Sequence, residues 1–237
     1  MTVRDKVVLI TGATGALGGA TAQAFARAGA RLALTARSEE RLEKLANSLN
    51  LSADRLLTLA ADVTDSTLVN HLVGQTVSYF GRVDALLHVA GGYRGGKTVA
   101  ETELDDLDFM LELNLKSTFL ICQAVLPHMV TQAWGRIVAI GARAAVRPTR
   151  RSGAYAASKA ALIALIETIA AEVKGSGITA NVILPSTIDT PTNRQFMPKA
   201  DFGKWVPPDQ IAAAMLYLCS DEAASISGAR IPVYGGA

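Results

Sequence analysis

The feature that most constrains the fold is a glycine-containing turn between a predicted strand and a predicted helix. Residues 6–11 form a short apolar, β-branched run, which predicts a buried strand, and the alanine-rich stretch 20–28 predicts a helix. The turn between them contains Gly12, Gly15 and Gly18. Glycines at this point permit a tight turn and a close approach of the backbone to a pyrophosphate, whose charge a helix N-terminus stabilises. The start of the chain therefore predicts a nucleotide-binding unit.

The rest of the chain continues the alternation of short apolar strands with helices. Strands are predicted at 31–36, 56–61, 85–90, 136–140, 179–184 and 229–234, and helices at 39–49, 66–80, within 104–130, at 152–174 and at 209–219. Such alternation predicts one doubly wound parallel sheet of about seven strands, with right-handed crossovers and helices on both faces. We therefore expect a single α/β domain of the Rossmann type over residues 1–237, with its ligands beyond the carboxyl ends of the strands.

Composition and charge narrow the class of partner. Half of the residues are hydrophobic and 19% are charged, so the chain can bury a sizeable core. The 23 basic and 21 acidic residues are scattered, which argues against nucleic acid or an anionic membrane as a partner and leaves a small molecule. One local exception is the arginine cluster, which we define as Arg143, Arg147, Arg150 and Arg151.

The cysteines and histidines show no spacing typical of metal ligands. Cys122 and Cys219 lie in apolar segments far apart, and no short motif joins them to His71, His88 or His128. Two buried thiols are therefore expected, rather than a disulfide or a metal site. The N-terminus is charged and no apolar run approaches the length of about 18 residues that a membrane span needs. These features predict a cytoplasmic protein.

The end of the second predicted strand carries a signal for the choice of cofactor. An Asp or Glu there contacts the ribose 2′-hydroxyl of NAD, whereas an Arg accommodates the 2′-phosphate of NADP. This chain has Ala36, Arg37 and Ser38 at that point. The alternative is that Arg37 only begins the following helix, but the missing carboxylate favours NADP(H) over NAD(H).

The helix predicted at 152–174 carries a tyrosine and a lysine four residues apart. At this spacing Tyr155 and Lys159 share one face of the helix. A phenol near its ordinary pKa of about 10 is a weak acid at neutral pH, and a cation held nearby lowers that pKa. The pair therefore predicts a proton donor assisted by an ammonium, although the same spacing alone also occurs in ordinary surface pairs.

A proline- and polar-rich segment at 185–208 interrupts the alternation. It contains Phe196, Met197, Phe202 and Trp205 but shows little periodicity. A loop this long within a compact domain is usually functional. We therefore expect a substrate loop here, with simple packing on the surface as the alternative.

With these pieces placed, the whole chain resembles the short-chain dehydrogenase/reductase family. The resemblance rests on Thr11, Gly12, Gly15, Gly18, Asp62, Val63, Ala90, Gly91, Asn114, Tyr155, Lys159, Asn181, Pro185, Ile188 and Thr190. It implies that Tyr155 donates a proton, that Lys159 lowers the pKa of Tyr155 and holds the nicotinamide ribose, and that Asn114 supports Lys159 through a water. The cofactor contacts that it implies are Gly12, Thr14, Gly15, Ala16, Leu17, Gly18, Arg37, Ser38, Asp62, Val63, Ala90, Gly91, Lys159, Pro185, Ile188 and Thr190. Family members are commonly tetramers or dimers, so a homo-oligomer is expected.

The chain departs from the family pattern in three ways. The middle glycine of the turn usually comes one place after Gly15, and His88-Val89 stands where two Asn are usual. The third departure concerns catalysis directly. The family's catalytic Ser usually lies 13 residues before the Tyr, and that place is Ala142.

One branch of the family, quinonoid dihydropteridine reductase, shares the departure at Ala142. Resemblance to this branch extends over segments in 89–96, 141–145 and 184–205. It implies a substrate pocket that includes Tyr93, Ala142, Tyr155 and Trp205. Against it, this branch generally favours NADH and has a Trp in place of Tyr93.

The leading hypothesis is an NADPH-dependent reductase with a pocket similar to that of a dihydropteridine reductase. The second is a carbonyl reductase of the 3-oxoacyl (acyl-carrier-protein) or small-ketone type that tolerates the missing Ser. The third, from another class, is a non-catalytic NADP-sensing module.

Overall fold

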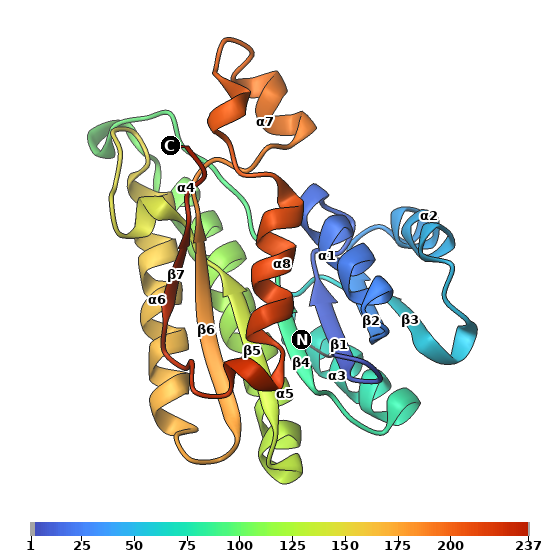
Figure 1. Ribbon diagram of the computed structural model, residues 1–237. Coiled ribbons are helices and arrows are strands. Elements are labelled where there is room, and N and C mark those ends of the chain that lie inside the picture. The colour runs from blue at the N-terminus through green and yellow to red at the C-terminus, as the bar shows by residue number, and fades with distance from the viewer. Residues whose placement is uncertain (1–2, 237) are drawn as a thin grey trace.

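A parallel sheet of seven strands forms the centre of the computed structural model, which describes residues 3–236 (Figure 1). The strands are β1 (Val7–Thr11), β2 (Arg31–Ala36), β3 (Leu56–Ala60), β4 (Ala85–His88), β5 (Gly135–Ile140), β6 (Ile178–Pro185) and β7 (Arg230–Val233). Their order is β3-β2-β1-β4-β5-β6-β7, and every pairing is parallel. This order confirms the doubly wound sheet that the alternating sequence pattern predicts.

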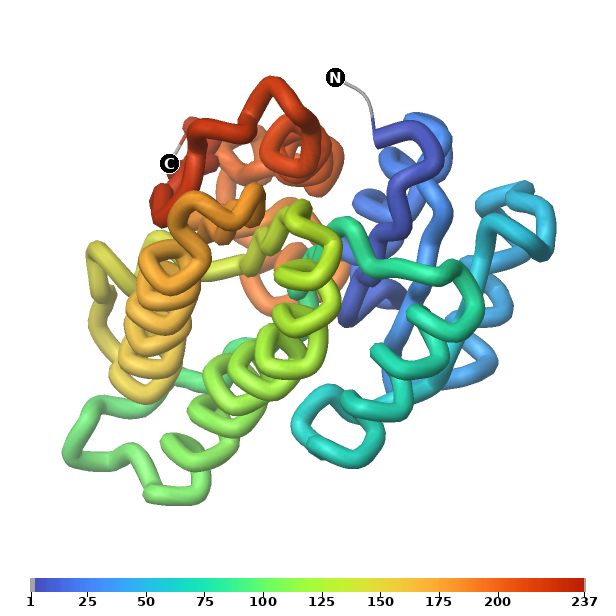
Figure 2. Tube along the Cα trace, turned by 90° about the horizontal axis from the view of Figure 1, so that it is seen from below, coloured from blue at the N-terminus to red at the C-terminus, as the bar shows by residue number. Residues whose placement is uncertain are grey.

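Helices cover both faces of the sheet. They are α1 (Ala16–Arg27), α2 (Glu39–Leu49), α3 (Ser66–Phe80), α4 (Leu104–Leu111), α5 (Ser117–Gln132), α6 (Gly153–Glu172), α7 (Pro191–Phe196) and α8 (Pro208–Leu218). Helices α3, α5 and α6 pack on one face, and α1, α2 and α8 pack on the other, as the view from below shows (Figure 2). The result is three layers with the sheet in the middle.

The side chains of β1 alternate between two hydrophobic cores. Val7 and Leu9 pack in the core beneath α3, α5 and α6, whereas Val8 and Ile10 pack in the core beneath α1 and α8. All four side chains are fully buried. Because a strand buried on both faces has no polar side, its sequence is a continuous apolar run, and this is why β1 could be predicted.

Helix α6 owes its apolar composition to burial in this arrangement. By length and composition alone, α6 and the helical stretch Leu104–Gln132 could each cross a membrane. In α6, however, Leu162 and Ile166 are fully buried against the sheet. The side chains that make α6 apolar thus belong to the core.

The segment at 185–208 is more regular than its sequence suggests. It contains α7, which begins at Pro191 after Thr190, and the Thr190 hydroxyl accepts a hydrogen bond from the Asn193 N–H at 3.1 Å. A capping Thr followed by Pro at the first helical position is a helix-start signal. The expectation of an aperiodic loop was therefore wrong for α7, because a helix of six residues is too short to show a hydrophobic period.

The same segment is closed at its base by backbone hydrogen bonds. The N–H of Asp189 donates to the carbonyl of Val206 at 2.8 Å, and the N–H of Val206 donates to the carbonyl of Thr187 at 2.9 Å. Ile188 and Val206 thereby form an isolated parallel bridge. Val206 is fully buried, so this closure is part of the core.

Candidate active site

The carboxyl ends of β1 and β4 meet where the strand order reverses. From β1 the chain continues to β2 and β3 on one side, and from β4 it continues to β5, β6 and β7 on the other. In open α/β sheets, ligands bind beyond the carboxyl ends of the strands at such a point. The glycine turn follows β1 there, and Ala90-Gly91 follows β4.

The glycine turn packs so closely that side chains are excluded from two positions. Gly12 has a φ of +65°, and a Cβ on it would lie 2.8 Å from the Cα of Ala90. A Cβ on Gly18 would lie 2.2 Å from the carbonyl oxygen of Gly12. Gly15 is the N-cap of α1 and has no side chain to accept hydrogen bonds from the first N–H groups of the helix. The turn therefore has the bare backbone that a pyrophosphate requires.

The neighbouring predicted residues of the turn differ in exposure. Ala16 is exposed and Thr14 is partly buried. Leu17 is buried and packs in the core beneath α1. Only the backbone of Leu17 is therefore placed to contact a cofactor.

Sequence analysis missed Arg41, which joins the end of β2 to the glycine turn. The guanidinium of Arg41 donates to the carbonyl of Thr14 at 2.7 Å, and the backbone N–H of Arg41 donates to the Ser38 hydroxyl at 3.3 Å. Arg37 is exposed beside this pair. The available signal was a basic residue in the first turn of a helix, where the helix dipole disfavours positive charge. Two arginines, Arg37 and Arg41, therefore lie close to the end of β2.

Asp62, after β3, is held by the following turn. Its carboxylate accepts hydrogen bonds from the N–H of Thr64 at 2.9 Å and from the Thr64 hydroxyl at 2.8 Å. The backbone hydrogen bond from Thr64 is the main cause that lowers the pKa of Asp62, and Arg37 and Lys116 add to it. Asp62 and Lys116 also line an open groove of about 470 Å³. Val63 beside them is buried.

Asn114 lies in a single π-helical turn, Glu112–Lys116, between α4 and α5. Its side chain is fully buried. The amide nitrogen donates to the carbonyl of Gly92 at 3.2 Å and to the Ser158 hydroxyl at 3.0 Å, and the amide oxygen accepts from the N–H of Gly92 at 3.1 Å. Such π-turns are frequent at functional sites. Asn114 thus ties the loop after β4 to helix α6.

Lys159 lies beside Asn114 at the same end of the sheet. Its side chain is 3% exposed, and its ammonium donates to the carbonyl of Ile140 at 2.7 Å. A Cβ placed on Gly91 would lie 2.9 Å from the amide oxygen of Asn114 and 3.1 Å from the nitrogen of Lys159. The structure therefore brings together Gly91, Asn114 and Lys159, three residues that the sequence assigned to the site.

Burial moves the pKa values of Tyr155 and Lys159 in opposite directions. It lowers the pKa of Lys159 to about 8, and burial, with a contribution from Tyr93, raises the pKa of Tyr155 to about 12. The expectation that Lys159 lowers the pKa of Tyr155 was wrong for this arrangement. The ammonium is turned toward Ile140, and the loss of hydration dominates at the phenol. Tyr155 therefore holds its proton at neutral pH.

The residues predicted to contact the substrate lie in three different environments. The rings of Tyr93 and Tyr155 meet edge to face with centroids 5.0 Å apart, and Tyr93 is 63% exposed. Ala142 is buried at the end of β5. Trp205 is 8% exposed and its ring lies 4.8 Å from that of Phe202. The burial of Trp205 favours the packing role that the sequence left open.

The predicted contacts at the nicotinamide end are placed by the strand–loop junction after β6. Pro185 is the last residue of β6. Ile188 is partly buried in the core beneath α8, and Thr190 caps α7. Hydrogen bonds within the loop thus fix the backbone around Ile188 and Thr190.

His88 forms a buried chain of hydrogen bonds between β1, β4 and the start of α5. The Ser117 hydroxyl donates to the carbonyl of Leu113 at 2.6 Å, so it must accept from the Nε2–H of His88, which lies 3.2 Å away. His88 Nδ1 then accepts from the Thr11 hydroxyl at 2.9 Å, and Thr11 accepts from the N–H of Ala90 at 3.2 Å. The chain fixes a neutral imidazole and orients the loop that holds Ala90.

Acidification is expected to destabilise the protein through His88. Burial, with a smaller effect of Lys159, lowers the pKa of His88 to about 3. Between about pH 6.5 and that value the unfolded chain binds a proton that the folded chain does not, so stability falls by roughly 1.4 kcal/mol per pH unit. His88→Asn removes this dependence. Chemical denaturation at pH 6 and pH 4 should show a smaller loss in the variant, and equal losses would contradict the assignment.

The described residues hold no metal-ligand cluster. Within residues 3–236, no group of three or more His, Cys, Asp or Glu side chains could hold a metal ion. Cys122 and Cys219 are free and buried, and burial raises the pKa of each thiol to about 12. Both thiols are therefore protonated and unreactive at neutral pH.

Comparison with known proteins gives a consistent identification. Residues 6–201 match the family model described as short chain dehydrogenase. D-threitol dehydrogenase of Mycolicibacterium smegmatis is 36% identical over 98% of this chain and 92% of its own length. The 3-oxoacyl-[acyl-carrier-protein] reductase FabG of Thermotoga maritima is 32% identical over 100% of this chain and 99% of its own. The solved structure of NAD+-bound xylitol dehydrogenase is 28% identical, with a TM-score of 0.92 and full coverage of both chains.

The match covers both the sequence elements and the architecture described above. The family model includes the glycine turn after β1, Asn114 and the Tyr155–Lys159 pair. The chain therefore belongs to the short-chain dehydrogenase/reductase family of NAD(P)-dependent oxidoreductases.

Proposed function

We propose that this protein is an NADPH-dependent reductase that transfers hydride to a small substrate, with Tyr155 as the proton donor. The observation that carries the proposal is the packing of Gly91, Asn114 and Lys159 at the carboxyl ends of the strands. Tyr155 lies on the same helix as Lys159 and contacts Tyr93. A buried amide and a buried cation at one point, with a protonated phenol on the same helix as the cation, support this proposal.

The residues present fit a dinucleotide. Gly12 and Gly18 let the backbone of the turn pack tightly, because a Cβ on either would lie within 3 Å of other backbone atoms, and a Cβ on Gly91 would crowd Asn114 and Lys159. The cofactor's nicotinamide would supply the hydride when bound. The glycine turn would hold the pyrophosphate. Lys159 would hold the nicotinamide ribose, and Asp62 would lie toward the adenine.

Tyr155 fits the role of general acid in the reductive direction. Its pKa of about 12 keeps the phenol protonated at neutral pH, so a proton is available to a substrate atom that gains negative charge. Lys159, with a pKa of about 8, remains mostly cationic at neutral pH. The side chain of Asn114 is already committed to Gly92 and Ser158, so it supports the backbone of the site.

Cofactor preference is expected to depend on Arg37 and Arg41. Both can donate to a 2′-phosphate, and hydrogen bonds to a charged group contribute roughly 1.5–3 kcal/mol, or about 10- to 100-fold in affinity. Arg37→Ala and Arg41→Ala should therefore raise the Kd of NADPH by such a factor and change that of NADH little. Fluorescence titration of both cofactors checks this.

Arg27→Ala is the matched control for these two variants, because Arg27 is exposed in the last turn of α1. It should leave the Kd of both cofactors unchanged. An equal loss of NADPH and NADH affinity in Arg37→Ala would show that Arg37 does not contact the phosphate.

Two substrate classes remain in the proposal, and each has its own support. A quinonoid dihydropterin spreads the negative charge of reduction over a ring, so it has less need of the donor missing at Ala142, and the exposed ring of Tyr93 offers it a flat surface. Carbonyl reduction is supported by the relatives, among them the 3-oxoacyl-[acyl-carrier-protein] reductase. A turnover screen with NADPH should include a quinonoid dihydropterin, a 3-oxoacyl thioester and several ketones. Oxidation of NADPH by none of them would contradict the reductase function.

The variant Ala142→Ser separates the two classes. On an isolated ketone, one additional donor to the developing oxyanion is worth about 10²- to 10³-fold in rate. The variant should therefore gain activity on ketones and change little on a dihydropterin. Comparison of kcat for both substrates checks this, and a gain on the dihydropterin alone would contradict the argument.

The compartment and the assembly complete the proposal. Two free, buried cysteines suit the reducing cytoplasm. Exposed Phe109, Phe119 and Val130 on α4 and α5 are suited to contacts between subunits, so we place the protein as a homo-oligomer, a dimer or tetramer.

A further inference from the structure

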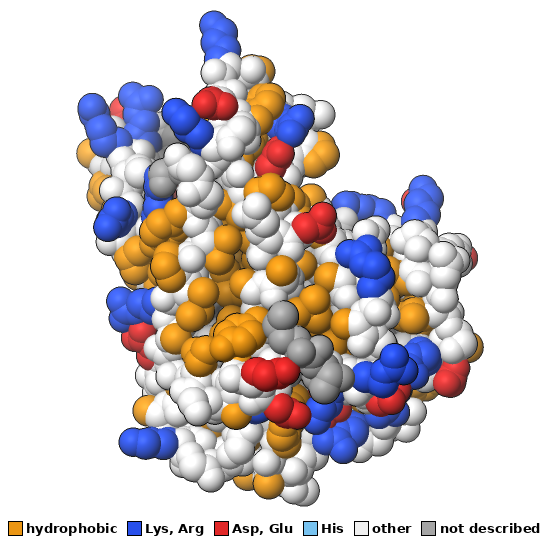
Figure 3. All heavy atoms as spheres, viewed as in Figure 1, with side chains coloured by type: hydrophobic (Ala, Val, Ile, Leu, Met, Phe, Trp, Pro, Cys, Tyr) orange, Lys and Arg blue, Asp and Glu red, His pale blue; other side chains and the backbone are white. Residues whose placement is uncertain are grey.

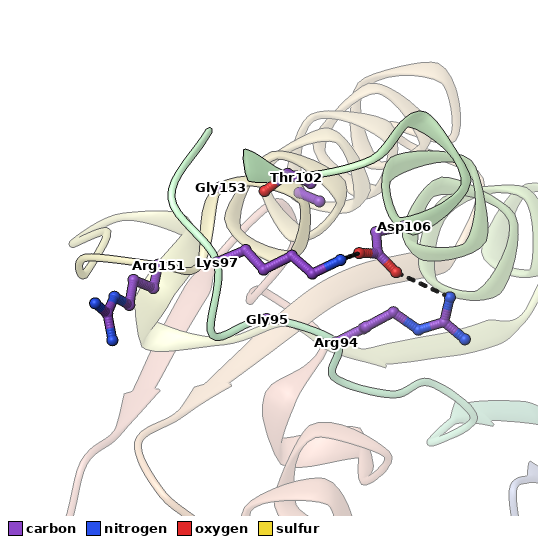
Figure 4. Close-up of a pocket in the computed structure, with 8 residues that line it drawn as sticks. Arg94, Gly95, Lys97, Thr102, Asp106, Arg151 and Gly153 are labelled. Atoms are coloured by element: carbon purple, nitrogen blue, oxygen red, sulfur yellow. Dashed lines mark hydrogen bonds and ion pairs between the residues drawn. The ribbon is translucent and has the colours of Figure 1, made fainter. Parts of the chain in front are cut away.

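The arginine cluster supplies positive charge that has no acidic partner. Segment 141–153 contains the four arginines of the cluster and no Asp or Glu. Within residues 3–236, none of the four makes an ion pair with a carboxylate. By contrast, Arg94 and Lys97 on the neighbouring loop both pair with Asp106 (Figure 4). Of these two neighbouring loops, the one with the arginine cluster is therefore the one whose positive charge is not neutralised by carboxylates.

The cluster lies at the end of the site where the substrate is expected. It begins directly after Ala142 at the end of β5 and ends just before α6, which carries Tyr155. The N–H of Gly96 donates to the carbonyl of Arg151 at 2.9 Å, so this loop packs against the loop that holds Tyr93. Lys and Arg side chains gather over these loops, at the upper left of Figure 3.

A dinucleotide does not require these charges. Its pyrophosphate would be met by the glycine turn after β1, and a 2′-phosphate by Arg37 after β2. On the sheet, β4 separates β1 from β5, which leads into the cluster. The charge beside Tyr155 is therefore left for another ligand.

Arg143 is the member of the cluster that is held in place. It is partly buried, and its guanidinium lies 5.6 Å from the centroid of the Tyr234 ring. The Tyr234 carbonyl accepts from the Ser186 hydroxyl at 2.7 Å, so Arg143 lies beside the chain that leaves β6. The N–H of Arg147 donates to the carbonyl of Arg143 at 2.8 Å, which places Arg147 one turn away.

The other two arginines are less suited to bind a substrate. Arg150 and Arg151 are exposed. In Figure 4 the guanidinium of Arg151 points away from Lys97 and Asp106. These two arginines add to the positive electrostatic potential of the loop without forming a defined binding site.

We propose that Arg143, with Arg147 beside it, binds an anionic group of the substrate, a carboxylate or a phosphate, while Tyr155 acts on the reducible group. This rests on the proposed function and names the substrate class within it. Arg143 makes no ion pair with a carboxylate of residues 3–236, so its guanidinium donors are available to an anionic ligand. A guanidinium also binds carboxylate or phosphate with two parallel hydrogen bonds, which orients the bound molecule.

The test compares ligands that differ in charge. Calorimetric titrations with NADP+ present, where no hydride can be transferred to the ligand, would use 4-oxopentanoate and its methyl ester, and pterin-6-carboxylate and 6-hydroxymethylpterin. In at least one pair the acid should bind about 10- to 100-fold more tightly than its uncharged partner, the range of a hydrogen-bonded charge. Arg143→Gln should remove most of this preference, and Arg147→Gln part of it. Arg27→Gln loses the same charge elsewhere and should keep it.

Several results would overturn the inference. These are the absence of any preference for the acid, or a preference that survives Arg143→Gln. An equal effect of Gln at Arg143, Arg147 and Arg27 that fades with salt would show a diffuse field rather than a site. If the protein reduces an oxoacyl thioester carried by an acidic carrier protein but prefers neither small acid, the arginines would bind the carrier protein rather than an anionic group of the substrate.

The inference and the proposed function fail in different ways. Reduction of uncharged ketones without any acid preference would leave the reductase in place and remove the anion site. If the protein prefers the acid through Arg143 but oxidises NADPH with none of the substrates tested, the anion site would stand and the reductase function would be contradicted.

Discussion

Tyr155→Phe should lower kcat by about 10²- to 10⁴-fold, the usual contribution of a positioned general acid. The phenol is the group that holds a proton at neutral pH, since burial raises its pKa to about 12. The substitution removes one oxygen and keeps the ring that meets Tyr93 edge to face. Steady-state turnover with NADPH on the best substrate of the screen measures the loss.

Binding measurements make this prediction specific. NADPH should bind the Tyr155→Phe variant with nearly unchanged Kd, because the hydrogen bond from Lys159 to the Ile140 carbonyl does not involve the phenol. Near-normal turnover would show that the proton comes from elsewhere, for example from water or Tyr93. Tight NADPH binding by the wild-type protein, with no turnover of any substrate, would instead support the non-catalytic sensing module.

Gly18→Ala should raise the Kd of NADPH by on the order of 100-fold. A Cβ at this position would lie 2.2 Å from the Gly12 carbonyl oxygen and 2.8 Å from the Cα of Ala13, and both are backbone atoms. The turn can make room only if its backbone moves, and overpacking of this kind costs about 1–3 kcal/mol. A 100-fold change in Kd corresponds to about 2.8 kcal/mol, near the upper end of that range. Titration of NADPH measures the effect.

The neighbouring glycine is a matched control. A Cβ on Gly19 would come no closer than 3.8 Å to any neighbouring atom, an ordinary contact. Gly19→Ala should therefore bind NADPH like the wild type and unfold at the same temperature or above it, since Ala favours the helix. Equal affinity of the two variants for NADPH would show that the turn does not approach the pyrophosphate.

The strands and the longer helices could be predicted because their cause is local. The run at 6–11 is apolar on both sides, and the structure buries it on both faces of the sheet as β1. The helix predicted at 152–174 begins and ends within two residues of α6. In both, the number of buried faces is visible in the order of residues along the chain.

The π-turn around Asn114 could not be predicted, because the helical pattern of 104–130 runs through it without interruption. Arg41 was missed because its contact with Thr14 joins residues far apart in the sequence. The predicted direction of the pKa shift at Tyr155 was wrong for a similar reason. Sequence spacing placed Lys159 on the same helix face, but burial depends on the packing of the surrounding loops. Long-range packing, rather than local propensity, sets these features.

The backbone closure at the base of the 185–208 segment makes that segment a replaceable module. Its two ends are joined through Asp189 and Val206 before the chain returns to α8, and the Lys204 carbonyl accepts a hydrogen bond from the N–H of Gly236 at 3.2 Å, so the residues from 191 to 203 are anchored on both sides. Loops grafted between 191 and 203 would keep these anchor points and would be varied independently of the glycine turn and of Tyr155. New substrate ranges could then arise by exchange of one peptide, with the chemistry of the site inherited unchanged.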